Sequence, residues 1–190
     1  MDSSEFNQIV ISWITISIAF AILISEDFLN IFGYAQSLPI ALVAVGTGFI
    51  FHELAHRNVA KLFGSHAEYR LWVPGLVFTL ISAFLGFIFA APGAVYISGK
   101  VSRQQNGMIA AAGPIANIII AFLFMMAAFY LAPQGLLLTI ILYSSYINFF
   151  LAFFNLLPFF ILDGAKVFSW NPIVWAVLIF IAAFGSFFLF

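Results

Sequence analysis

The chain has 190 residues, of which 65% are hydrophobic and only 7% are charged, and its mean hydropathy is +1.16. Because soluble domains carry about 25% charged residues, this composition excludes an ordinary water-soluble globular protein. A formal net charge of −1 without a basic segment indicates no nucleic acid partner. The absence of cysteine excludes disulfide bonds and thiolate metal ligands.

Predominantly apolar segments follow one another along the chain. About 20 such residues are enough for a helix to cross the hydrocarbon core of a bilayer. We therefore expect transmembrane helices over 8–25, 38–63, 106–130, 136–157 and 171–190, separated in part by the polar breaks "SEDFLN", "LAPQG" and "SWNP". No basic residues precede the first segment and no small-residue cleavage site follows it, so we interpret it as a retained helix rather than a signal peptide.

The segment 71–99 is long enough to span the membrane, but prolines and glycines interrupt it. Its last part continues into "GAVYISGKVS", which alternates and turns at Ser98–Gly99, and this predicts a short β-hairpin. Cytoplasmic loops tend to collect Lys and Arg. All six basic residues fall on one side of the membrane if 71–105 leaves one face and returns to it, with the N-terminus inside. Non-helical backbone at membrane depth must be covered by protein or line a cavity, so the hairpin indicates a functional region.

Together these segments predict an all-α polytopic membrane protein with about five to six transmembrane helices and a small membrane-embedded, re-entrant β-hairpin. We expect one integral membrane domain over 1–190, with its core at 38–168 and flanking helices at 8–25 and 171–190. No long linker, repeat or low-complexity segment divides the chain. The lipid bilayer is therefore an expected partner.

The second predicted helix contains three ionisable residues within five consecutive positions, in the sequence "HELAH". Ionisable groups inside a span are costly and mark functional sites. His52 and His56 are four residues apart and share one face of a helix. With Glu53 they form the H-E-x-x-H arrangement, in which two imidazoles bind Zn²⁺ and the carboxylate acts on a water molecule. The alternative is a polar helix end from which Arg57 and Lys61 extend to the membrane interface.

A catalytic zinc ion usually has three protein ligands and one open coordination position. His66 and Glu68 follow the two histidines of "HELAH", but we expect them to be solvated in the polar turn "GSHAEYR". Asp163 ends a charge-free stretch over 104–162 and has a setting comparable to that of the histidines. The histidines and Asp163 lie toward the C-terminal ends of two spans that run in the same direction, so we expect them near the same membrane face.

In three blocks the sequence resembles the site-2 proteases, a family of intramembrane zinc metallopeptidases of the M50 type. The blocks are "HELAH" at 52–56, "AAGPIAN" at 111–117 and "NLLPFFILDG" at 155–164. The last block matches the family pattern N-x-x-P-x-x-x-L-D-G in its spacing. The chain is similar to a short prokaryotic or archaeal member, because 190 residues leave no room for a PDZ-like domain.

The resemblance implies a role for each residue of the expected site. One Zn²⁺ per chain is bound by His52, His56 and Asp163, and Glu53 is the catalytic acid and base. Asn155 lies near the cleft, where its amide could hydrogen-bond the substrate backbone or the oxyanion. A helix–helix hydrogen bond is the alternative role for Asn155.

Three further residues in or near these blocks have less specific roles. We interpret Asn117 as structural, and Gly113 with its flanking alanines as a site of close helix packing. Lys166 follows Asp163 by three residues and either tunes that carboxylate or extends to the membrane interface.

We therefore expect a zinc metalloendopeptidase that hydrolyses a peptide bond within or near the transmembrane segment of membrane protein substrates. The expected location is the cell membrane, with the active site toward the cytoplasmic side. A substrate helix must be unwound before hydrolysis, and the edge of the predicted hairpin could bind the unwound strand. The alternatives are a transporter or ion channel that uses Glu53 and Asp163 as cation or proton sites, and an adaptor with a structural zinc. The sequence indicates neither an oligomeric state nor a particular substrate.

Overall fold

The computed structural model describes residues 2–25, 31–159 and 161–189. Its elements are, in chain order, α1 (Ser3–Ile24), α2 (Ile31–Val45), the π-helical turn η1 (Gly46–Ile50), α3 (Phe51–Leu62), β1 (His66–Leu71), α4 (Val73–Phe84), β2 (Gly93–Ser98), α5 (Arg103–Leu131), α6 (Gly135–Asn155), α7 (Asp163–Trp170) and α8 (Pro172–Phe188). The chain is thus mostly helical with one small sheet, as predicted.

Among the described residues, four helices are long and apolar enough to cross a membrane. They are α1, the continuous run from Gln36 to Leu62 through η1 and α3, α5 and α6. The helices α4 and α8 are apolar but shorter. With 12 residues, α4 is about 18 Å long, well short of a hydrocarbon core of about 30 Å.

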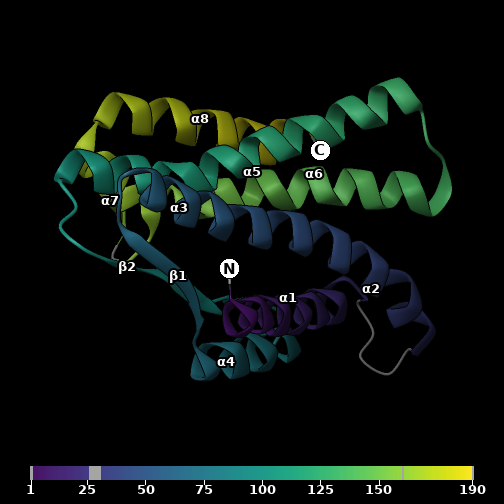
Figure 1. Ribbon diagram of the computed structural model, residues 1–190. Coiled ribbons are helices and arrows are strands. Elements are labelled where there is room, and N and C mark those ends of the chain that lie inside the picture. The colour runs from purple at the N-terminus through teal and green to yellow at the C-terminus, as the bar shows by residue number, and fades with distance from the viewer. Residues whose placement is uncertain (1, 26–30, 160, 190) are drawn as a thin grey trace.

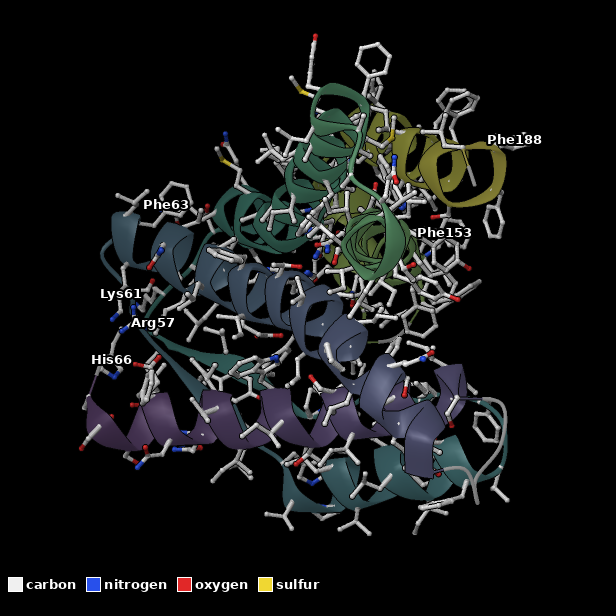
Figure 2. The ribbon with its side chains drawn as sticks, turned by 90° about the vertical axis from the view of Figure 1, so that its right-hand side faces the viewer. Arg57, Lys61, Phe63, His66, Phe153 and Phe188 are labelled. Carbon is white, nitrogen blue, oxygen red and sulfur yellow. The ribbon has the colours of Figure 1, made fainter. Side chains whose placement is uncertain are left out.

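Two groups of helices pack on either side of the continuous run α2–η1–α3. On one side α5 and α6 pack against each other and α6 packs against α8, and on the other side α1 packs against α4 (Figure 1). Figure 1 shows α5 and α6 lengthwise, whereas Figure 2, turned by 90°, shows α1 lengthwise, so α1 crosses the direction of α5 and α6. The core of the first group is built around Phe149 and Ile118, and that of the second around Val45 and Ile16.

Local capping groups explain where several of the helices begin or end. Asp2 accepts a hydrogen bond from the Glu5 amide at 2.7 Å, so α1 begins well before the predicted residue 8. The predicted turn "LAPQG" is confirmed, since α5 ends at Leu131, its C-cap Ala132 is in the left-handed conformation, and α6 begins at Gly135. Asn171 caps α8, and Pro172 occupies its first turn. The predicted break "SEDFLN" lies, from residue 26 onward, outside the described residues.

The prediction of a hairpin turning at Ser98–Gly99 was wrong, because β2 pairs with β1. The two strands are antiparallel, with His66 opposite Ser98 and Leu71 opposite Gly93. The polar segment that we had interpreted as a solvated turn is therefore a strand. Alternation within one strand predicts its faces but does not identify its partner, which here lies beyond α4. Since Leu71 lies opposite Gly93, the intervening segment leaves and rejoins the sheet at the same end.

Side chains of α1 accept hydrogen bonds from the edge of β1 that faces away from β2. The Tyr69 amide donates to Glu5 Oε1 at 3.0 Å, and the Leu71 amide donates to Gln8 Oε1 at 3.0 Å. Because outward and inward amides alternate in an antiparallel pair, the amides of Val95 and Ile97 on β2 must face away from β1. One edge of the sheet is thus capped by α1, and the outer edge belongs to β2.

A buried ion pair fixes α1 to α3 beside this edge. Arg57 Nη2 donates to Glu5 Oε2 at 3.0 Å, and Arg57 Nε lies 2.6 Å from Glu5 Oε1. Both residues are buried, and Figure 2 shows Arg57 on the side of α3 that faces α1. The Glu5 carboxylate in the first turn of α1 therefore has a structural partner.

We predict that Glu5→Gln lowers the free energy of unfolding by about 3 kcal/mol, because it leaves the Arg57 guanidinium buried without a counter-charge. The measurement is unfolding in a mixed-detergent titration followed by helical circular dichroism. Glu68→Gln is the control, since it breaks a more exposed pair with Arg70 and should cost less than about 1 kcal/mol. Equal effects of the two substitutions would show that the buried pair does not anchor α1.

Candidate metal centre

His52, His56 and Asp163 meet in the interior, although Asp163 is more than 100 positions away in the sequence. All three are buried, and one ligand atom from each lies within 4.8 Å of the others. Asp163 Oδ2 is 3.3 Å from His52 Nε2 and 3.0 Å from His56 Nε2. The two Nε2 atoms are 2.9 Å apart, with the imidazole planes at 84° to each other. The predicted ligand set, which we call the metal group, therefore converges in space.

The hydrogen bonds of the two imidazoles show that this group fits a metal ion. His52 Nδ1 lies 2.6 Å from Asn117 Oδ1, and His56 Nδ1 lies 2.7 Å from the carbonyl oxygen of Ile109. Both partners are acceptors, so each Nδ1 carries a proton, and in a neutral ring each Nε2 then presents a lone pair. The two lone pairs and the Asp163 carboxylate then face one another without a donor between them. A cation satisfies all three, and imidazole nitrogen with carboxylate oxygen is a donor set suited to zinc.

Asp163 reaches the histidines from the start of a separate short helix, and not from the end of the preceding span as we had expected. The span α6 ends at Asn155, a turn follows, and Asp163 is the first residue of α7. At Gly164 a Cβ atom would collide with the carbonyl oxygen of Leu156, so glycine allows α7 to begin against the end of α6. Lys166 Nζ lies 3.4 Å from Asp163 Oδ1, which leaves Oδ2 directed toward the imidazoles.

The other residues considered in the sequence analysis lie outside this group of three ligands. Glu53 follows His52 on α3 and is half-buried. Asn155 is half-buried as well, and its amide donates to the Leu151 carbonyl at 3.0 Å within the same helix. His66 and Glu68 lie on β1, where they contact each other at 3.5 Å instead of joining the metal group.

The sequence analysis missed the direct contact between Asn117 and the metal group. We had interpreted Asn117 as structural, yet it is fully buried and binds the ring of His52. One signal was present in the sequence: an uncharged polar residue in the middle of an apolar span needs a hydrogen-bond partner. Which partner it finds depends on how α5 packs against α3.

Gly113 lies on α5, as Asn117 does, and its Cα faces the two imidazoles of the metal group. A Cβ atom at this position would lie 2.7 Å from His52 Nε2 and would also collide with His56 Nε2. We expect Gly113→Ala to displace the imidazoles and to weaken zinc binding by about tenfold or more. Zinc content after purification and competition with a chelating dye measure this effect.

Gly185→Ala is the matched control for general crowding. Its Cβ would collide with the ring of Phe149 in the packing between α6 and α8, and neither residue contacts a metal ligand in the described hydrogen bonds and ion pairs. This control should lose stability and keep its zinc affinity. Wild-type zinc affinity in Gly113→Ala would contradict the geometry described above.

Comparison with known proteins supports the metal assignment. The chain is 42% identical over 181 residues to a protein of Methanocaldococcus jannaschii named "Putative zinc metalloprotease MJ0611". The alignment covers 94% of this chain and 93% of that protein. No protein-family model and no solved structure matches the chain. The relative's name and the buried group of two histidines and one aspartate together identify the cofactor as zinc. The chain thus belongs to the family of zinc metalloproteases that this archaeal relative represents.

Proposed function

We propose that the protein is an intramembrane metalloendopeptidase of the site-2 protease type, which cleaves membrane protein substrates within or near a transmembrane segment. One observation carries this proposal: two of the three metal ligands, His52 and His56, lie in the run Gln36–Leu62, which is long and apolar enough to span a bilayer. His52 precedes the end of α3 by about 15 Å along the helix axis. A substrate bond that reaches this depth would belong to a membrane-embedded segment.

His52, His56 and Asp163 would hold the zinc ion and leave one coordination position open. Zinc, when bound, supplies Lewis acidity that polarises a carbonyl group and makes a water molecule more acidic. Glu53 lies next to His52 on α3, and in our proposal its carboxylate removes a proton from the attacking water. The carboxylate then gives that proton to the amine nitrogen as the peptide C–N bond breaks. The carboxyl product retains the oxygen of the water molecule.

The outer edge of β2 is the proposed binding site for the unwound substrate strand. The backbone of a helix is hidden in its own hydrogen bonds, so unwinding requires replacement partners in a membrane. The outward amides of Val95 and Ile97 offer such partners through strand addition. The side chains of these two residues pack against Ala60 of α3 and Ile109 of α5, which connects the strand to the helices of the metal group.

We further propose that the active site opens toward the cytoplasmic side of the cell membrane. The end of α3, the start of α5 and α7 lie together at the left of Figure 1. These segments and the residues just before α5 carry most of the basic side chains, namely Arg57, Lys61, Lys100, Arg103 and Lys166. An excess of Lys and Arg is typical of cytoplasmic segments.

The alternative of a transporter or ion channel is not favoured. The related protein is named as a zinc metalloprotease, and Asp163 is directed toward two imidazoles rather than being a carboxylate without a partner. A purely structural zinc site does not require an acid or base, so it would not explain the carboxylate of Glu53 next to the first ligand.

We predict that Glu53→Gln retains zinc and lowers cleavage by at least about 100-fold, because the acid and base of the reaction is lost. The assay is incubation of the purified protein in detergent with a panel of single-span substrates, with and without a chelator. Glu68→Gln is the control, since it removes a carboxylate on β1 that contacts His66 and Arg70. Normal cleavage by Glu53→Gln would exclude the acid and base role, and altered ion flux without a peptide product would favour a transporter.

We predict that Val95→Pro lowers cleavage roughly fivefold or more, as expected from the loss of one backbone hydrogen bond of about 1 kcal/mol to the substrate. Proline is tolerated at an edge position whose amide faces away from the ladder, so zinc content should be unchanged. Val95→Ala is the control, because it loses side-chain packing and keeps the amide donor. If both variants cleave equally well, the outer edge of β2 is not the substrate site.

A further inference from the structure

A chain of buried amide side chains leads from η1 to the metal group. Asn148 on α6 and Asn117 on α5 are both fully buried. Asn148 Nδ2 donates to the Ser144 carbonyl at 2.8 Å and to Thr47 Oγ1 at 3.2 Å. Asn117 Nδ2 donates to Asn148 Oδ1 at 3.0 Å and to the Gly48 carbonyl at 2.8 Å. The chain ends at His52, whose Nδ1 lies 2.6 Å from Asn117 Oδ1.

Backbone carbonyl groups give this chain a single direction. A carbonyl oxygen only accepts, so the amide nitrogen of Asn148 must face Ser144 and its oxygen must face Asn117. In the same way the Gly48 carbonyl requires the nitrogen of Asn117, which turns Oδ1 of Asn117 toward His52. Reversing the Asn117 amide would place two acceptors against each other at Gly48.

We propose that Asn148 and Asn117 act as positioning residues that hold the proton of His52 on Nδ1 and its lone pair on Nε2. In this orientation the ring can bind zinc only through the nitrogen that faces His56 and Asp163. His56 needs no such chain, because its Nδ1 faces the carbonyl of Ile109 directly. The inference rests on the metal centre and is independent of the proposed peptide hydrolysis.

Two neighbouring residues of the π-helical turn η1, Thr47 and Gly48, each accept a hydrogen bond from this chain of amides. Thr47 donates its hydroxyl proton to the Val43 carbonyl at 2.8 Å, so its oxygen is free to accept from Asn148. Gly48 offers its carbonyl to Asn117, and a Cβ atom at Gly48 would lie 2.6 Å from the Leu151 side chain of α6. Single π-helical turns occur frequently at functional sites. Here the turn allows α5 and α6 to meet the helix just before the first metal ligand.

The first test is zinc affinity, measured by competition with a chelating dye in the absence of substrate. We expect Asn117→Ala to raise the Kd for zinc by about 10–100-fold, as for other residues that orient a metal ligand. Asn148→Ala should weaken binding in the same direction by a smaller factor, because Asn117 keeps its bond to Gly48. Asn117→Asp keeps an acceptor for His52 and loses both donors, so it should bind zinc more tightly than Asn117→Ala.

Ser145→Ala is the matched control for the loss of a buried bond between the same two helices. Ser145 Oγ donates to the Ala121 carbonyl at 2.9 Å and lies outside the amide chain. We expect this variant to keep the wild-type Kd for zinc even where it loses stability. A loss of zinc affinity equal to that of Asn117→Ala would overturn the proposal in favour of general packing.

A spectroscopic test is possible because the chain contains only three histidines. His66→Gln removes the exposed one, so ¹⁵N-histidine labelling then reports only the two rings of the metal group. In the zinc-loaded protein we expect two protected Nδ1–H signals, of which Asn117→Ala removes or broadens one. Two unchanged signals together with wild-type zinc affinity in Asn117→Ala would overturn the proposal.

Discussion

Three electron-pair donors meet in a buried volume without a proton between them, and the rest of the structure depends on this arrangement. The two Nε2 atoms and the Asp163 carboxylate lie about 3 Å from one another, at separations that a shared cation makes favourable. Such a group cannot assemble by hydrophobic packing alone. Neighbouring elements must orient each donor and also leave space for its side chain.

Each of the three donors has its own partner on the side away from the metal. Asn117 contacts His52, the Ile109 carbonyl contacts His56, and Lys166 contacts Asp163. These partners come from α5 and α7, and glycines at two close approaches allow those helices to reach α3 and α6. The metal centre is therefore a property of four packed helices, and the "HELAH" turn alone supplies only part of it.

The same requirement for hydrogen-bond partners explains the small sheet. Backbone donors in an apolar environment need acceptors, and α1 supplies them to β1 through Glu5 and Gln8. The outer edge of β2 is then the one that can pair with another strand. The helix α1, which is remote from the metal ligands in sequence, thus occupies one edge of the sheet.

Much of the molecule could be predicted from the sequence because the relevant signals are local. Apolar length predicts the helices, since the bilayer thickness sets how many residues a span needs. The four-residue spacing of His52 and His56 places them on one face of a helix whatever surrounds it. Asp163 was identified as the third donor by its charge within an apolar region and by its motif.

Other features depend on contacts between residues that are distant in the sequence, so local patterns did not reveal them. By itself the sequence determined the mostly helical class and the zinc-binding residue types, because composition and helical periodicity are properties of neighbouring residues. Only the tertiary structure decided that β1 pairs with β2, that Asp163 begins its own helix and that Asn117 orients His52. Strand pairing and buried hydrogen bonds depend on how whole elements pack. The partner of a given strand or amide is therefore fixed only by the position of another part of the chain.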